Sequence, residues 1–163
     1  MTALTIRLLG AGLLALAGGL LGYEKKAELK RRQTCLDRLC SALGRMESEL
    51  VALQTPLPQL LARLEDCPFF LLVSAGFGGE PLERLWRRAA EVQPLPEADR
   101  QLLGELGSVI GRCDAQRQAA EIALTRQQLR ERSAALEREM AERGRHFTGL
   151  GAALGAMLAA VLF

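Results

Sequence analysis

The chain has 163 residues, of which 49% are hydrophobic and only 4% aromatic, a composition that favours a single domain of Ala- and Leu-rich helices over β-sheet. Its 21 basic and 19 acidic side chains nearly cancel, which argues against a nucleic-acid partner. The four cysteines form no Cys-x-x-Cys pair and the only histidine is His146, so we expect neither a metal site nor a cofactor.

Both ends of the chain are apolar. No charged residue occurs between Arg7 and Glu24, nor from residue 147 to the end. We predict transmembrane helices over residues 4–23 and 147–163, near the short end of the length that a bilayer requires. The alternative for the first segment is a cleaved signal peptide, with Ala15-Leu16-Ala17 as its cleavage site. The hydrophobic stretch continues beyond that site, which favours a retained span.

Basic residues flank both apolar segments on the side of the central region. Five follow the first segment (Lys25, Lys26, Lys30, Arg31 and Arg32), and three precede the second (Arg138, Arg143 and Arg145). The positive-inside rule therefore places residues 24–146 in the cytoplasm and both termini on the far side of the cell membrane. Basic residues beside a membrane are attracted to anionic headgroups, so membrane lipid is an expected partner.

Glycines recur at a spacing of four within both apolar segments, at Gly18 and Gly22 and at Gly151 and Gly155. This spacing lets helix backbones approach closely in lipid, which predicts contact between the two spans or with another membrane subunit. Glycine is also common in membrane helices in general, so this second interpretation stays open.

The long helices of the central region are expected at its two ends, because all six prolines fall between residues 56 and 96. Apolar residues recur at spacings of three and four in the first helix, which predicts one buried stripe (Leu36, Leu39, Leu43, Met46, Leu50 and Leu53). The helix should end near Gln54, because Thr55 can cap a short helix that starts at Pro56 and reaches about Glu65.

Shorter elements follow. Residues 69–75 form an apolar piece whose apolar side should fill the core beneath the long helices, and glycines at 76–79 predict a turn. A helix is predicted over 81–92, and another begins near Glu97 and Asp99, where the helix dipole favours acids, and ends at Gly111 in a left-handed cap. Asp114 is a natural N-cap for the last helix, which carries inward residues as far as Arg143 (Ala115, Ala119, Ile122, Leu129, Ser133, Leu136 and Met140).

The predicted fold is therefore all-α. We expect an antiparallel bundle of about six helices over residues 24–146, with two long membrane-proximal helices, flanked by N- and C-terminal transmembrane helices.

No set of residues suggests catalysis. His146 lies at the expected membrane boundary, and the glycines at 76–79 lack the lysine and the preceding strand of a phosphate-binding loop. Glu47 and Glu49 cannot share one helical face, which argues against paired acid–base chemistry. We predict no catalytic residues and no enzyme. Trp86, which has three arginines around it, is either a binding hot spot or a core tryptophan, and we favour the core.

Two stretches resemble the signature of a known family. Ala42-Leu43-Gly-Arg-Met46-Glu47-Ser48-Glu49-Leu50, followed by Gln54-Thr55-Pro56-Leu57, is similar to the "L-x-x-L-E-T-E-I … T-P-L" pattern of stage III sporulation protein AB. Leu106-Gly107-Ser-Val-Ile110-Gly111-Arg-Cys-Asp114-Ala-Gln-Arg-Gln118 is similar to that family's "L-G-x-x-L-G-x-x-D-x-x-x-Q" pattern. Met46, Leu50 and Ile110 depart from it conservatively. The matching positions are expected to make packing or partner contacts (Leu43, Glu47, Glu49, Thr55, Pro56, Leu57, Gly107, Gly111, Asp114 and Gln118).

The resemblance implies a function. Members of this family are subunits of the channel that endospore-forming bacteria build between mother cell and forespore, and they lie in the mother-cell membrane. Their soluble domain is similar to the platform proteins of type II secretion and type IV pilus systems. The resemblance therefore implies a non-enzymatic platform that couples a cytoplasmic secretion-type ATPase to other channel subunits. A homo-oligomer is compatible with this role.

The docking surface for such a partner is expected in the middle of the chain. Residues 50–111 hold eight acidic and five basic side chains, whereas both flanks are basic. We therefore expect an acidic docking surface that includes Glu80, Glu83 and Glu91. The alternative function is a two-span membrane sensor or ligand-binding protein, whose domain would normally face outward; an output domain is not evident in this sequence.

Overall fold

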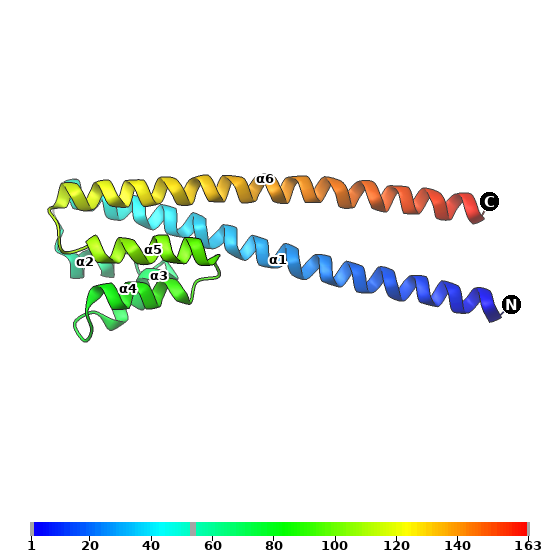
Figure 1. Cartoon of the computed structure of the whole chain (residues 1–163), viewed down its shortest axis with the longest axis horizontal. Coiled ribbons are helices and arrows are strands. Elements are labelled where there is room, and N and C mark those ends of the chain that lie inside the picture. The colour runs from blue at the N-terminus through cyan, green and yellow to red at the C-terminus, as the bar shows by residue number, and fades with distance from the viewer. Residues whose placement is uncertain (1, 53–54, 163) are drawn as a thin grey trace. The chain divides into compact units, whose positions relative to one another are not determined.

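The computed structural model of the chain describes the backbone of residues 2–52 and 55–162 and the side chains of residues 24–52 and 55–142. This part of the chain forms six helices and no strand, with one isolated β-bridge between Phe77 and Glu80. The helices are α1 (Thr2–Ala52), α2 (Leu57–Ala62), α3 (Pro68–Gly76), α4 (Leu82–Glu91), α5 (Glu97–Val109) and α6 (Ala115–Leu162) (Figure 1). The prediction of an all-helical fold is confirmed.

The chain divides into two compact units. One, which we call the central bundle, comprises residues 32–139, and the other comprises residues 1–31 together with 140–163. The side chains of the predicted spans, 4–23 and 147–163, lie outside the described residues, as do the glycines at 18, 22, 151 and 155. Among the side chains that are described, no helix offers an apolar stretch that could cross a membrane.

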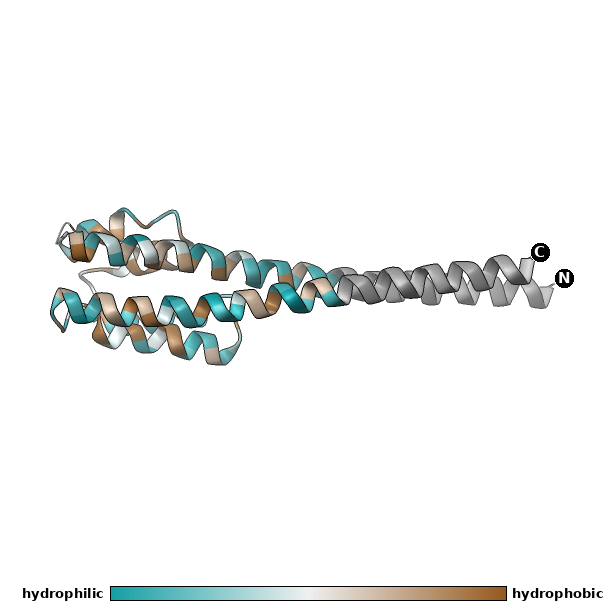
Figure 2. Cartoon of the chain, turned by 90° about the horizontal axis from the view of Figure 1, so that it is seen from above, coloured by the Kyte–Doolittle hydropathy of each residue, from teal (hydrophilic) through white to brown (hydrophobic). Residues whose placement is uncertain are grey.

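The core of the central bundle lies along the predicted stripe of α1. The five described members of this stripe, from Leu36 to Leu50, are all buried, and Leu53 lies outside the described residues. On α6, Ala119, Ile122 and Leu129 are buried at the predicted spacing. Figure 2 shows hydrophobic positions, in brown, recurring among hydrophilic ones along these helices. Each long helix thus buries one face and leaves the other to solvent, as amphipathic helices do.

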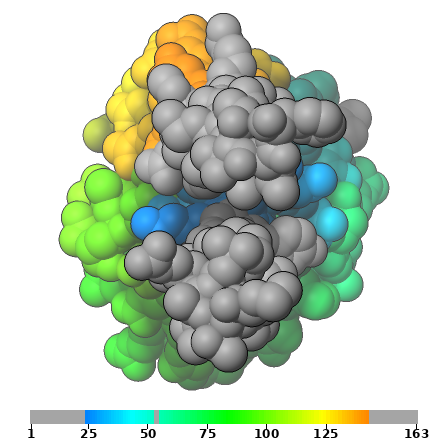
Figure 3. All heavy atoms as spheres, turned by 90° about the vertical axis from the view of Figure 1, so that its right-hand side faces the viewer, coloured from blue at the N-terminus to red at the C-terminus, as the bar shows by residue number. Residues whose placement is uncertain are grey.

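Polar contacts join α1 to α6 within the central bundle. Gln33 donates a hydrogen bond of 2.7 Å to Glu137, and the Ser133 hydroxyl donates one of 3.0 Å to Asp37. Because the residue number rises on α1 from 33 to 37 while it falls on α6 from 137 to 133, the two helices are antiparallel to each other here. Figure 3 looks along the long helices. The green atoms of the α4 and α5 region lie on the left, and the teal atoms of residues between about 50 and 75 lie on the right.

Three aromatic rings pack together where α3 meets α4. Phe69 and Phe70 of α3 meet Trp86 of α4 edge-on, with ring centroids 5.1 and 5.5 Å from that of the indole. All three side chains are fully buried. The favoured interpretation of Trp86 as a core residue is therefore confirmed, and edge-to-face packing adds to the stabilisation that burial provides.

The start of α2 differs from the prediction. The helix begins at Leu57, no side chain caps it, and Thr55 is buried. Pro56 has an extended ψ of 138°, and its carbonyl accepts the first helical bonds from Gln59 and Leu60. The predicted Thr55 cap is wrong because a proline fixed in this conformation is itself the capping residue. The helix also ends three residues early, at Ala62.

Asp99 was expected to lie in the first turn of α5 as a helix-dipole residue. It does lie in this turn, but its side chain is only 6% exposed and forms an ion pair with Arg132 of α6, whose side chain is 40% exposed. A buried carboxylate requires a charged or hydrogen-bonding partner. The residue therefore connects two helices across the bundle, a role that its local sequence did not indicate.

The N-cap of α6 is confirmed. The Asp114 carboxylate accepts a hydrogen bond of 2.8 Å from the backbone N–H of Arg117. We expect Asp114→Ala to lower the free energy of unfolding by about 1 kcal/mol, because it leaves this N–H without its acceptor. Asp114→Asn, which keeps the acceptor, should lose much less. Urea unfolding followed by circular dichroism measures both, and equal losses would contradict the capping role.

Candidate docking surface

The second of the two family-like stretches, residues 106–118, forms the connection between α5 and α6. An added Cβ at Gly107 would lie 2.5 Å from the Cβ of Trp86, so only glycine lets α5 pack this closely on α4. Gly111 has a φ of +79°, in the left-handed region that glycine favours. The Gln118 amide accepts a 3.1 Å hydrogen bond from the Gly111 N–H and donates one to the Cys113 carbonyl. Together these residues hold the turn in one conformation.

The first family-like stretch, residues 42–50 and 54–57, joins α1 to α6 and to the region of α2. Leu43 is fully buried in the core, whereas Leu57 packs partly buried against it. Glu47 forms an ion pair of 3.0 Å with Arg126 of α6, and Glu49 forms one of 3.0 Å with Arg63 beside α2. The two carboxylates thus point to different helices, consistent with their spacing of two residues.

The whole pattern matches a known family. A family model described as stage III sporulation protein AB (spore_III_AB) matches residues 7–163 of the chain. The chain belongs to this family. A solved structure described as "Stage III sporulation protein AB (SpoIIIAB)" has a TM-score of 0.60 at 20% sequence identity, over 68% of this chain and 97% of that chain. At this identity the likeness establishes the fold alone. No curated protein sequence matches significantly.

Membership in the stage III sporulation protein AB family identifies this chain as a sporulation protein. The family-motif positions in the present structure occupy the core, the α1 ion pairs and the α5–α6 turn. They explain how this fold is held together. Pro56, Gly111 and Asp114 are exposed as well, and exposed residues in other parts of the central bundle are further candidates for a partner surface.

Neither the potential metal ligands nor the cysteines of the described residues mark a partner surface. Among the described side chains, no three His, Cys, Asp or Glu residues are grouped as metal ligands. The four cysteines are free thiols, of which Cys40 and Cys67 are buried. Burial raises the pKa of both, and it raises that of Cys35 to about 11.

These pKa values predict slow reaction with thiol reagents. The thiolate is the nucleophile, so at about pH 8 Cys35, Cys40 and Cys67 remain protonated and should react slowly, and the rate at Cys35 should rise as the pH approaches 11. The half-buried Cys113 should react first, so Cys113→Ser should remove the fast phase of a titration with Ellman's reagent. Rapid reaction of all four thiols in the folded protein would contradict this expectation.

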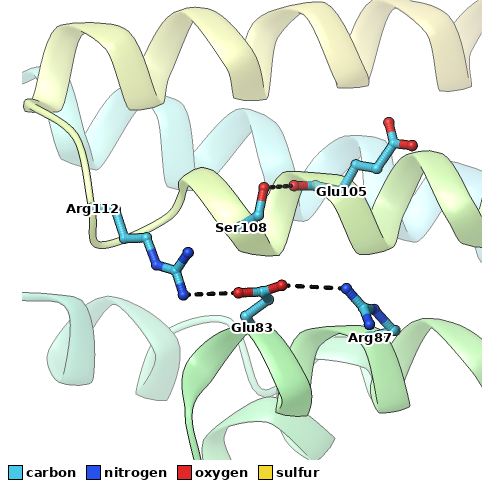
Figure 4. A network of polar contacts seen from close by, with 5 residues as sticks. All are labelled: Glu83, Arg87, Glu105, Ser108 and Arg112. Carbon is cyan, nitrogen blue, oxygen red and sulfur yellow. Dashed lines mark hydrogen bonds and ion pairs between the residues drawn. The ribbon is translucent and has the colours of Figure 1, made fainter.

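Two of the three glutamates of the predicted acidic surface form ion pairs with arginines. Glu83 forms ion pairs with both Arg87 and Arg112, at 3.3 and 2.8 Å, and lies between them in Figure 4. Glu80 pairs with Arg88 at 3.0 Å. In each pair the arginine is the more exposed partner, with 61–65% of its side chain accessible against 31–35% for the glutamates. At Glu80 and Glu83 the guanidinium groups therefore extend further into solvent than the carboxylates, whereas Glu91 is exposed, and the acidic docking surface stays a prediction.

One side of α3 fills the core, as predicted, and the other side does not. Phe69, Phe70 and Val73 are buried, but Leu71 and Leu72 are 48% and 47% exposed. A nine-residue helix that is apolar on nearly all sides cannot bury every side chain against one core. Its uniform hydrophobicity was the signal that could have indicated a contact surface.

Proposed function

We propose that this chain is a non-enzymatic platform subunit of the channel between mother cell and forespore. In this proposal, residues 4–23 and 147–163 anchor it in the mother-cell membrane, and the bundle between them couples a secretion-type ATPase to other channel subunits. The observation that carries the proposal is the extent of the family match, residues 7–163, which includes both apolar ends as well as the bundle.

The composition next to the apolar ends supports a membrane location. Lys25 and Lys26 are exposed, and Arg138 is exposed near the other end of the bundle sequence. Such residues attract anionic lipid headgroups, each contributing about 1 kcal/mol near a charged surface. The proposed partners are accordingly membrane lipid, the ATPase and other channel subunits.

The orientation is tested by cysteine labelling from outside the cell. Cys67 is a poor reporter because it is buried, whereas Val51 at the end of α1 is 61% exposed. A Val51→Cys variant should react with a membrane-impermeant maleimide only after the cells are permeabilised. Labelling in intact cells would place the bundle outside and favour the sensor over the platform.

The coupling is tested by capture of the ATPase. Full-length protein in nanodiscs that contain anionic lipid should retain the sporulation ATPase of the same operon, and empty nanodiscs should not. Deletion of the gene should block sporulation, and the intact chain should restore it. Failure of the full-length protein to retain the ATPase under any lipid composition would refute the coupling role.

A further inference from the structure

Exposed apolar side chains concentrate in one part of the central bundle. Among the described side chains, six large hydrophobic residues are exposed, and four of them lie within residues 71–92 (Leu71, Leu72, Phe77 and Val92). The other two, Val51 and Leu124, are isolated on the long helices. Single exposed hydrophobic residues are ordinary, whereas a group of them often marks a binding surface.

On α3 the exposed residues share one helical face. Pro68, Leu71, Leu72 and Ala75 are all exposed, and they follow the spacing of three and four that places side chains on one side of a helix. The opposite side, with Phe69, Phe70 and Val73, is buried against Trp86 and the rest of the core. The helix therefore has two apolar faces, of which the bundle covers one.

The edge of α4 beside this face is basic. An added Cβ at Gly76 would meet the Leu85 side chain at 2.4 Å, so α3 and α4 touch at these residues. Arg84 directly precedes Leu85 on α4, and Arg88 follows it by one helical turn, so both arginines belong to the part of α4 that adjoins the end of α3. Arg84 and Arg88 lie one turn apart, and Val92 continues the row. All three side chains are exposed.

The ion pair that Arg88 makes is exposed to water. Its partner Glu80 lies in the loop before α4, and the arginine is 61% exposed. Exposed ion pairs contribute about 0–1 kcal/mol because water competes for both groups. A carboxylate that arrives on a partner protein, with water excluded around it, can therefore share or replace Glu80 as the acceptor.

The geometry points to the α3–α4 face, formed by Pro68, Leu71, Leu72, Ala75, Phe77, Arg84, Arg88 and Val92, as a docking site for an acidic amphipathic helix of a cytoplasmic protein. The apolar side of that helix would lie on Leu71 and Leu72, and its carboxylates would pair with Arg84 and Arg88. Interfaces of this kind depend on a few apolar and arginine anchors. The inference rests on the proposed function for the cytoplasmic location of the partner and for its identity as the ATPase.

Photocrosslinking in sporulating cells tests the occupant directly. The full-length protein carries benzoylphenylalanine at position 72 or, as a matched control, at position 124 of α6, whose natural leucines are 47% and 52% exposed. We expect position 72, and not position 124, to crosslink to a segment rich in Asp and Glu, identified by mass spectrometry. Crosslinks from position 72 to lipid, to a basic segment or to a second copy of this chain, or no crosslink at all, would overturn the inference.

Variants of the full-length protein in nanodiscs separate this inference from the proposed function. Arg84→Glu with Arg88→Glu, and Leu71→Ser with Leu72→Ser, should each weaken ATPase capture by about tenfold or more. The controls Arg130→Glu and Leu124→Ser, on α6, should leave it unchanged, and unfolding midpoints should show that all variants fold. Capture that is equally strong in every variant would overturn the α3–α4 face alone. If the wild-type protein captures no ATPase while position 72 still crosslinks to an acidic helix of another channel subunit, the coupling role fails and the face stands.

Discussion

Arg132→Ala is expected to lower the free energy of unfolding by about 3 kcal/mol. Within this ion pair the Asp99 side chain is buried and the Arg132 side chain is partly exposed. The variant therefore leaves a buried carboxylate without its partner. Asp99→Ala should cost less, because the Arg132 side chain that remains is 40% exposed and keeps much of its hydration. Denaturant unfolding of the full-length protein in detergent, followed by circular dichroism, measures both.

The double variant distinguishes a paired charge from simple packing. If the cost of Arg132→Ala comes from the unpaired carboxylate, adding it to Asp99→Ala should have little further effect. Arg130→Ala, two residues before Arg132 on the same helix and exposed, is the matched control and should change stability by less than about 0.5 kcal/mol. Equal and additive losses from both single variants would show that the ion pair does not control this contact.

Gly107→Ala is expected to lower the free energy of unfolding by about 2 kcal/mol, although alanine is the better helix former. The new methyl group would lie 2.5–2.9 Å from the Cβ, Cγ and Cδ1 atoms of Trp86. The indole cannot easily move away, because Phe69 and Phe70 pack against it edge-on. Either α5 moves outward or the aromatic cluster loses its packing.

Gly104 provides the control for this substitution on the same helix. An added Cβ there would meet only the Arg87 side chain, at an ordinary distance of 3.8 Å. Gly104→Ala should therefore raise stability by about 0.5–1 kcal/mol through helix propensity. Thermal unfolding of the two variants side by side checks the difference in sign, and a stabilising Gly107→Ala would refute the close packing of α5 on Trp86.

Features that depend on local periodicity could be predicted from the sequence. The stripe of α1 from Leu36 to Leu50, the Asp114 cap and the left-handed Gly111 each follow from spacing or from the conformational preference of one residue type. The same holds for the burial of Trp86, whose helix pairs one apolar face with several charges. These predictions needed no knowledge of which helices meet.

Features that depend on contacts between helices could not be predicted in this way. A residue count gives the acidic side chains of the middle region equal weight, but it cannot show that Glu80 and Glu83 pair with more exposed arginines of α4. Nor could it show that Asp99 meets Arg132, since the two are 33 positions apart and on different helices. The outward face of α3 was missed because hydrophobicity alone does not say which side of a helix the core covers.

The hydrogen bond between Gln33 and Glu137, close to the first and last residues of the central bundle, has a consequence for engineering. Because the chain joins and leaves the bundle at adjoining points, residues 32–139 should tolerate transplantation onto any antiparallel pair of helices that ends at the same separation. The same adjacency would allow circular permutation, with a short linker across these points and new termini opened in the turn before α6.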